Sequence, residues 1–231
     1  MFEKPYKSLN LDEAKADLHS QGFHQVPIRL DEIALTAAIA QMDEICASNE
    51  ELEVNYGGSE HRIWHAHKHI AAAEAFRQFS DEIVPKLGDD IKPAKNILAI
   101  RNKPLSNDNN ELHKGRWHLD SFRTQYKIFV FLQDVGPNDG PFELVPQTQK
   151  TSVKFKHAIQ GRYFRAKDLI LRTGKRGYQH VSDSFVEHVE RKYPSQLFTV
   201  PAGTILIANT SALHRAHPVN GGERYALTSY H

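Results

Sequence analysis

The first third of the sequence has the spacing of apolar residues that is typical of helices. Residues 11–20 and about 31–48 repeat apolar side chains every three to four positions, and the second stretch opens with acidic residues that suit a helix N-terminus. A third stretch, about 69–87, is rich in Ala and other good helix formers. Between the first two, FHQVPI predicts a short strand. We therefore expect residues 1–92 to form a mainly helical flank.

After Pro93 the pattern changes to short runs of β-branched and aromatic residues. These runs are separated by Gly, Pro, Asn and Asp, the residues that commonly end strands. Residues 93–231 are therefore expected to form a β core, either a sandwich or a barrel. The predicted fold class is mainly β with flanking helices, in one domain over 1–231, because all-β folds of this length commonly keep a single core. The runs are KNILAIRN, YKIFVFLQDV, PFELVP, SQLFTVPA, TILIANT and RYALTSYH.

A polar segment rich in Lys and Arg, about 156–192, separates two groups of these predicted strands. Insertions of this length within a compact domain are commonly lids or binding loops. One hypothesis is therefore a mobile lid that meets an anionic group of a substrate. The alternative is a peripheral decoration whose charges are solvated. The cations that the lid hypothesis assigns to the substrate are Arg162, Arg165, Lys167 and Arg172.

The overall charge and the cysteine content exclude several classes of protein. Lys and Arg number 29 against 28 Asp and Glu, a formal charge of +1, so no nucleic-acid partner is expected. Cys46 is the only cysteine, which excludes an internal disulfide and suits a reducing compartment. The polar start of the chain lacks a signal-peptide pattern, and no apolar run could span a bilayer. We expect a cytoplasmic protein without a membrane partner.

Two histidines and an aspartate have the arrangement of iron ligands. His118 and Asp120 lie just before the run YKIFVFLQDV, and on extended backbone residues two apart point to the same face. His214 follows the run TILIANT, where turn-like residues indicate the end of a strand. Two His and one carboxylate on one face of an octahedral iron leave three adjacent positions for a bidentate oxo acid and O₂. We therefore predict a non-haem Fe(II) site at these three residues, which are also the predicted catalytic residues.

Several other histidines among the 14 in the chain offer alternative ligands. His65, His67 and His69 alternate before the third helix and on a strand would resemble a cupin metal site, but on a helix residues two apart do not share a face. His217 lies three residues after His214 and could replace it as a ligand. His113 could replace His118, although no carboxylate lies two residues after His113.

The motifs around the predicted ligands resemble the phytanoyl-CoA dioxygenase-like family of Fe(II)/2-oxoglutarate-dependent oxygenases. WHLDSF, followed by KIFVFLQDVGPNDGPFELVPQT, is similar to the family's iron-binding His-x-Asp and the Gly-Pro segment after it. VPAGTILIANTSALHRAHPVNGGERYALTSYH is similar to the family's ending, with the distal iron-binding His and a later Arg for 2-oxoglutarate. The resemblance implies a double-stranded β-helix (jelly-roll or cupin-like) core. It also implies the co-substrates 2-oxoglutarate and O₂, with Arg224 as the 2-oxoglutarate-binding residue.

The resemblance implies a reaction as well. The expected activity is a dioxygenase that hydroxylates a small-molecule metabolite, with release of succinate and CO₂. Asp120 agrees with hydroxylation, because the halogenase relatives have a small residue at this position to admit a halide. The alternative is a catalytically silent or non-oxidative cupin-like metal-binding barrel. Binding of 2-oxoglutarate would separate the two.

The residues around Arg224 agree with a position inside the barrel. Strand alternation in RYALTSYH places Arg224, Ala226 and Thr228 on one face, where the small neighbours leave room for a ligand. A guanidinium offers a planar, permanently charged partner for a carboxylate. The alternative is a surface arginine after the Asn-Gly-Gly turn. Arg101 and Asn102, at the end of KNILAIRN, are further candidates for a polar contact to the co-substrate or substrate.

One loop departs from the family pattern. Residues 146–149 read Pro-Gln-Thr-Gln where the family usually has Pro-Gly-Ser-His. The predicted iron site does not use this loop, so the departure concerns the substrate rather than the metal.

Overall fold

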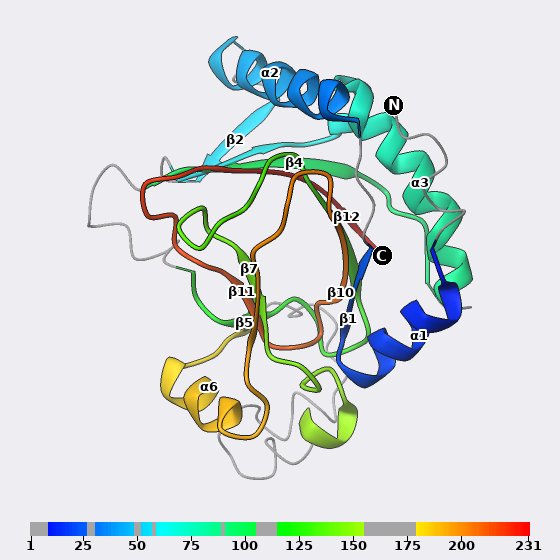
Figure 1. Ribbon diagram of the computed structural model, residues 1–231, viewed down its shortest axis with the longest axis vertical. Helices are drawn as coiled ribbons and strands as arrows, with labels where there is room; N and C mark the ends of the chain where they lie inside the picture. The colour runs from blue at the N-terminus through cyan, green and yellow to red at the C-terminus, as the bar shows by residue number, and fades with distance from the viewer. Residues whose placement is uncertain are drawn as a thin grey trace.

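Two antiparallel β-sheets lie face to face, and three helices cover the outer side of the larger sheet (Figure 1). The predicted fold class, mainly β with flanking helices, is thereby confirmed. None of the helices in the described parts of the chain is long and apolar enough to cross a bilayer. The computed structural model describes residues 9–26, 31–48, 52–56, 59–88, 91–104, 115–154 and 179–231.

The N-terminal part forms the predicted helices together with three short strands. Each predicted helix agrees with the structure within two residues at either end, and FHQVPI contains the predicted strand. A hairpin between the second and third helices was not predicted, because its four-residue strands carry little apolar pattern. The elements are α1 (Leu11–Ser20), β1 (Phe23–Val26), α2 (Glu32–Ser48), β2 (Glu53–Tyr56), β3 (Glu60–Ile63), the 3₁₀ helix η2 (Ala66–Lys68) and α3 (Ala71–Leu87).

The C-terminal part supplies the centre of both sheets. The larger sheet has the order β1-β10-β6-β12-β4-β3-β2, and the smaller has the order β8-β5-β11-β7-β9. All six predicted β runs contain strands, whereas β5, β8 and β11 were not predicted because they are two or three residues long and lie outside any longer apolar run. The strands are β4 (Ile97–Asn102), β5 (His118–Leu119), β6 (Tyr126–Phe131), β7 (Phe142–Leu144), β8 (Gln179–His180), β9 (Gln196–Phe198), β10 (Ile205–Asn209), β11 (His214–Ala216) and β12 (Arg224–Tyr230).

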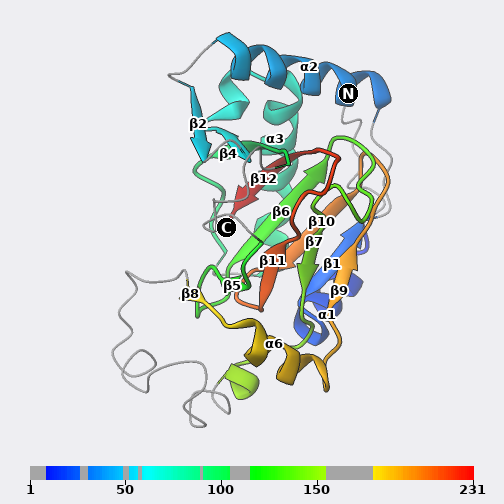
Figure 2. The ribbon, with the colours of Figure 1, turned by 90° about the vertical axis from the view of Figure 1, so that its left-hand side faces the viewer.

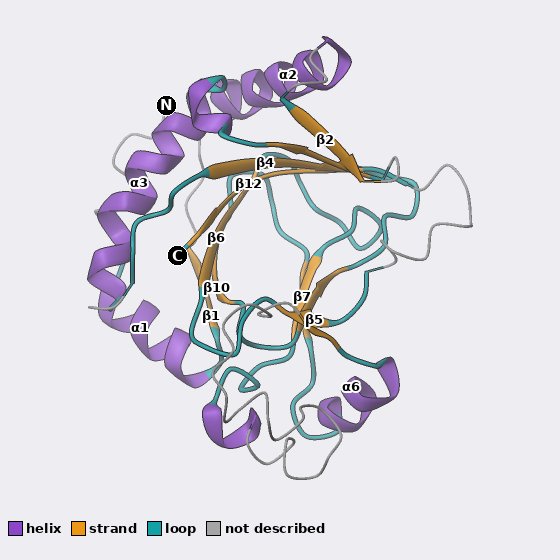
Figure 3. Ribbon diagram, turned by 180° about the vertical axis from the view of Figure 1, so that it is seen from behind, coloured by secondary structure: helices purple, strands orange, loops and turns teal. Residues whose placement is uncertain are grey.

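The central strands of the larger sheet are apolar on both faces, which explains why β6 and β10 read as nearly continuous hydrophobic runs. On β6, Ile128 and Val130 pack against the helices, while Phe129 and Phe131 point between the two sheets. Figure 3 shows α1 and α3 along the outer side of this sheet. Burying one such large side chain stabilises the fold by about 1.5–3 kcal/mol. One core thus lies between the helices and the larger sheet, and the other lies between the two sheets.

The C-terminal part of the predicted insertion belongs to the barrel rather than to a loop. β8 pairs with β5, so it extends the smaller sheet. The helix α6 (Asp183–Glu190) follows and lies below the smaller sheet (Figure 2). Its buried residues Phe185, Val186 and Val189 share a cluster with Trp117 and Leu119 around β5. The four cations assigned to a lid, Arg162, Arg165, Lys167 and Arg172, lie outside the described residues.

Candidate metal centre

Strand pairing brings the predicted ligands together in the smaller sheet. His118 on β5 and His214 on β11 are direct partners in the antiparallel register, and their ring centroids lie 4.3 Å apart. Asp120 follows β5, where its backbone N–H donates to the Thr210 carbonyl at 3.0 Å. One nitrogen of each imidazole and one oxygen of the carboxylate lie within 4.8 Å of one another. The three side chains therefore converge on a single point.

Hydrogen bonds fix the orientation of both imidazoles. Nδ1 of His118 lies 2.8 Å from the Arg116 carbonyl, and Nδ1 of His214 lies 3.0 Å from the Ala212 carbonyl. Each carbonyl can only accept, so Nδ1 carries the hydrogen and the lone pair is on Nε2. Nε2 of His214 is buried and has no hydrogen-bond partner among the described residues. A buried acceptor without a partner is costly, and a metal ion at this point would satisfy it.

The electrostatics favour the protonation states that metal binding needs. Burial, with a further effect from His214, lowers the pKa of His118 to about 3, so the imidazole is neutral. Burial alone would raise the pKa of Asp120, but Lys127 and the two histidines hold it well below its usual value. The site therefore offers a neutral His118 imidazole and the Asp120 carboxylate at neutral pH.

Lys127 is a member of the site that sequence analysis missed. It lies on the interior face of β6, where its ammonium is 2.8 Å from Oδ2 of Asp120 and 4.3 Å from the Tyr230 ring centroid. Burial alone would lower the pKa of this lysine, but the Asp120 carboxylate raises it. A signal was present in the sequence, because Lys127 shares the alternation of Phe129 and Phe131, and a cation in such a series is unusual.

Arg224 lies on the interior face of β12, as its alternation predicts. Ala226 belongs to the core between the sheets, whereas Tyr225 and Leu227 belong to the core under the helices. The guanidinium donates to the Gly140 carbonyl and, at 2.8 Å, to Oδ1 of Asn102. No carboxylate among the described residues lies within ion-pair distance of it, and its Nε has no hydrogen-bond partner there. Burial lowers the pKa of Arg224 to about 10, which still leaves it charged at neutral pH.

The structure does not assemble a metal site from the rival histidines in its described parts. His65, His67 and His69 surround η2 rather than alternating along a strand. His217 is engaged elsewhere, with its Nε2 2.8 Å from the Glu143 carboxylate. His113 lies outside the described residues.

A second group of possible ligands lies at the outer corner between α2, β2 and β3. Cys46, Glu53 and His61 bring their ligand atoms within 4.8 Å of one another. The imidazole of His61 and the carboxylate of Glu53 already bind each other. Burial raises the pKa of the Cys46 thiol, which opposes the thiolate form that binds metals. The interior triad is therefore the stronger candidate.

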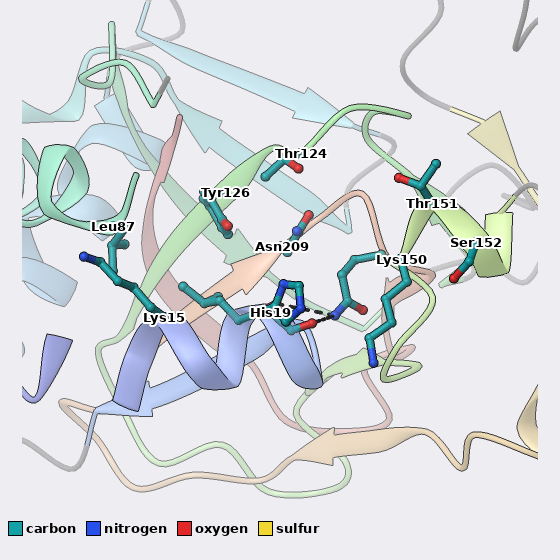
Figure 4. Close-up of a pocket in the computed structure, with 11 residues that line it drawn as sticks. Lys15, His19, Leu87, Thr124, Tyr126, Lys150, Thr151, Ser152 and Asn209 are labelled. Carbon is teal, nitrogen blue, oxygen red and sulfur yellow. Dashed lines mark hydrogen bonds between the residues drawn. The ribbon is translucent and has the colours of Figure 1, made fainter. Parts of the chain in front are cut away.

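A cavity of about 700 Å³ lies outside the barrel. Figure 4 shows it between α1, which contributes Lys15 and His19, and the ends of β6 and β10, which contribute Tyr126 and Asn209. Tyr126 packs against the core under the helices, on the opposite face of the sheet from Lys127. This cavity is therefore separated from the triad by the larger sheet.

Several solved structures with a similar fold are of alpha ketoglutarate dependent enzymes or contain 2-oxoglutarate. The alpha ketoglutarate dependent carbocyclase SnoK from nogalamycin biosynthesis aligns with 97% of this chain and 84% of its own, with a TM-score of 0.68 and 16% identity. The epimerase SnoN in complex with Fe3+, alpha ketoglutarate and nogalamycin RO aligns with 95% of this chain and 82% of its own, with a TM-score of 0.63 and 15% identity. EctD from S. alaskensis with 2-oxoglutarate and 5-hydroxyectoine aligns with 100% of this chain and 77% of its own, with a TM-score of 0.63 and 12% identity.

The chain has the double-stranded β-helix fold of these enzymes. The predicted jelly-roll core is therefore confirmed. No family model and no curated protein matches the sequence. The likeness thus lies in the fold, and the roles of individual residues rest on the site geometry.

Proposed function

We propose that the chain is a 2-oxoglutarate-dependent non-haem iron dioxygenase of the phytanoyl-CoA dioxygenase-like type that hydroxylates a small molecule. The observation that carries this proposal is the convergence of His118, Asp120 and His214 inside a barrel of the oxygenase fold. Two neutral imidazoles and a carboxylate form the donor set of Fe(II) oxygenases, and they leave three coordination positions for other ligands. Two proteins that share the fold have been crystallised with these ligands: SnoN with Fe3+ and alpha ketoglutarate, and EctD with 2-oxoglutarate.

Arg224 supports 2-oxoglutarate as the co-substrate. The buried guanidinium has a carbonyl and an amide oxygen as its direct partners and, among the described residues, no carboxylate at ion-pair distance, so a dicarboxylate would supply a direct anionic partner. We propose that Arg224 binds the distal carboxylate while the oxo-acid end binds iron. Asn102 orients the guanidinium, since it accepts one of its hydrogen bonds.

When bound, iron and 2-oxoglutarate supply the oxidising chemistry, with O₂ consumed and succinate and CO₂ released. The chain supplies positions and a dry environment. His118 and His214 hold their Nε2 lone pairs toward one point because their Nδ1 atoms are held by backbone carbonyls. Lys127 holds Oδ2 of Asp120, which orients the carboxylate. Phenylalanines between the sheets, including Phe129 and Phe142, exclude water from the interior.

The metal site is tested by anaerobic titration with Fe(II). The wild-type protein should bind one equivalent, and His118→Ala or His214→Ala should abolish stoichiometric binding because each removes one of three ligands. His217→Ala is the matched control, since His217 lies close in sequence but pairs with Glu143. Full retention of iron by both ligand variants would reject this site.

The co-substrate site is tested by 2-oxoglutarate binding to the iron-loaded protein. Loss of one member of a buried charge pair typically costs about 2–5 kcal/mol, so Arg224→Ala should weaken binding by well over tenfold. Iron affinity should change little. Arg101→Gln is the matched control, because Arg101 lies in the adjacent strand but pairs with Asp43 and Glu223 outside the barrel. Iron binding without any 2-oxoglutarate binding would favour the non-oxidative metal-binding barrel.

A further inference from the structure

A second cavity, of about 460 Å³, lies at the end of the barrel where β4 begins and β12 ends. Two of its walls come from the interior faces of neighbouring strands: Leu98 of β4 and Tyr230 of β12. Leu98 is the register partner of Thr228, and Tyr230 continues the interior series that begins at Arg224. The cavity is lined by Trp64, Lys92, Pro93, Lys95, Asn96, Leu98, Tyr230 and His231.

Two side-chain contacts connect the wall of this cavity to the metal centre. The Tyr230 ring lies against the Lys127 ammonium, with 4.3 Å between the ring centroid and Nζ. The same ammonium lies 2.8 Å from Oδ2 of Asp120. A molecule in contact with Tyr230 is therefore separated from the carboxylate ligand by two side chains. The 700 Å³ cavity of Figure 4 lacks such a connection, because it lies on the other face of the sheet.

The walls of the 460 Å³ cavity combine flat apolar surfaces with positive charge. Trp64 is 41% exposed although it is a large hydrophobic residue, and it shares the cavity with Tyr230 and Leu98. Lys92 and Lys95 are both exposed, and none of the described lining residues has a carboxylate side chain. The His231 imidazole is occupied on both nitrogens, by the Lys92 carbonyl at 3.0 Å and the Ser229 hydroxyl at 2.8 Å.

We propose that this cavity binds the primary substrate, and that the substrate is a small organic anion with a flat apolar body. The apolar body packs against Trp64, Leu98 and Tyr230, and the anionic group meets Lys92 and Lys95. A cavity of this volume suits a small molecule, because ligand pockets typically enclose about 300–1,000 Å³. The assignment as a substrate site rests on the proposed oxygenase function, whereas the class of ligand rests on the cavity walls alone.

The ligand class is tested with a matched pair of probes, 2-naphthoate and the neutral 2-naphthylmethanol. Binding is measured by titration calorimetry on the full chain after treatment with a chelator, so the result does not depend on iron. Naphthoate should bind about three- to tenfold more tightly than the alcohol, as expected for contacts to exposed cations. Lys92→Gln with Lys95→Gln should abolish this preference. Trp64→Ala should weaken the binding of both probes by about tenfold. Because Trp64 is exposed, this substitution should leave the core intact.

Lys103→Gln is the control for loss of a positive charge away from the cavity, since Lys103 follows the opposite end of β4 and does not line the cavity. Equal binding of the two probes, or naphthoate affinity unchanged in the double glutamine variant, would overturn the ligand class. Absence of naphthoate binding at millimolar concentration would overturn it as well.

The position beside the metal centre is tested in the protein loaded with Fe(II) and 2-oxoglutarate under argon. Naphthoate should change the visible absorption of the iron centre, and Trp64→Ala should raise the concentration needed for this change by about tenfold. Naphthoate that binds as expected but leaves the spectrum unchanged would refute the cavity as a substrate site. Failure of iron or 2-oxoglutarate to bind at all would instead refute the proposed function and leave the ligand class standing.

Discussion

Three buried cations in the described part of the chain differ in their partners, and these partners distinguish the cations of the candidate site from one outside it. Lys127 has a carboxylate at 2.8 Å, and Arg224 has two neutral oxygen acceptors. Lys154 has only the Phe122 carbonyl, at 3.0 Å, among the described residues. Burial lowers the pKa of Lys154 to about 8, so its charge at neutral pH weakens the fold. It has no role in the proposed site.

Lys154→Met should therefore stabilise the protein at pH 7. The pKa falls from 10.5 to about 8 on folding, which corresponds to roughly 3 kcal/mol at most, and the lost hydrogen bond offsets about 1 kcal/mol. Between pH 8 and 10.5 the unfolded chain binds more protons at Lys154 than the folded protein, so wild-type stability gains with rising pH. The advantage of the variant should shrink over that window. Urea unfolding of the wild type and the variant at pH 7 and pH 10 gives their free energies of unfolding. The same difference between the two proteins at both pH values would show that Lys154 does not titrate as expected.

At the scale of an element, the loop after β7 explains how an atypical sequence still supports the metal site. Gln147 stands where the resemblance places Gly, and it adopts the left-handed conformation, with φ 67°. Thr148 stands where it places Ser. Its hydroxyl donates to the Val145 carbonyl at 2.6 Å and accepts from the Leu213 N–H at 2.8 Å. The loop thus holds the residue immediately before His214.

Thr148→Val should destabilise the protein and weaken iron binding, whereas Thr148→Ser should preserve both. Valine has the same shape but leaves the buried Leu213 N–H without an acceptor, which costs about 1–3 kcal/mol. Because Leu213 precedes His214, the imidazole should also lose some of its fixed position. Chemical unfolding and Fe(II) titration of the two variants test this. Similar iron affinity and stability in valine and serine variants would show that the hydroxyl does not support the ligand strand.

At the scale of the whole molecule, the proposed site joins segments that are far apart along the chain. His118, His214 and Arg224 come from three strands in two sheets, and they meet only when the barrel closes. An unfolded chain cannot hold this arrangement. Ligands that require it must therefore bind the folded state alone, and they stabilise it by mass action.

Fe(II) together with 2-oxoglutarate should raise the melting temperature under argon. A ligand at one hundred times its Kd adds about 2.7 kcal/mol, and each kcal/mol shifts Tm by roughly 2–4 °C in a chain of this size. A chelator should reverse the shift. Arg224→Ala should keep the part due to iron and lose most of the part due to 2-oxoglutarate, and His214→Ala should lose both. A shift of equal size in His214→Ala would mean that the metal binds elsewhere.

The sequence by itself determined the helices, the longer strands and the candidate ligands. Periods of 3.6 and 2 residues are set by near neighbours in the chain, so α1, α3, β6 and β12 could be predicted from their own residues. The same alternation predicted that Arg224 and Ala226 share a face, which the two cores confirm for Ala226. His118 and Asp120 could be paired for the same reason, because they are two residues apart.

Only the tertiary structure decided what lies opposite these residues. The pairing of His118 with His214, the ion pair between Lys127 and Asp120, and the addition of β8 and α6 to the barrel all depend on contacts between distant segments. The short strands β5, β8 and β11 lie outside any longer apolar run, so their own residues could not predict them, and their pairing with one another and with β7 depends on the folded chain. The cavity beside Tyr230 likewise exists only because the Trp64 segment and the residues before β4 pack at the end of the barrel. Local periodicity carries no information about such partners, since they are chosen by the packing of the whole fold.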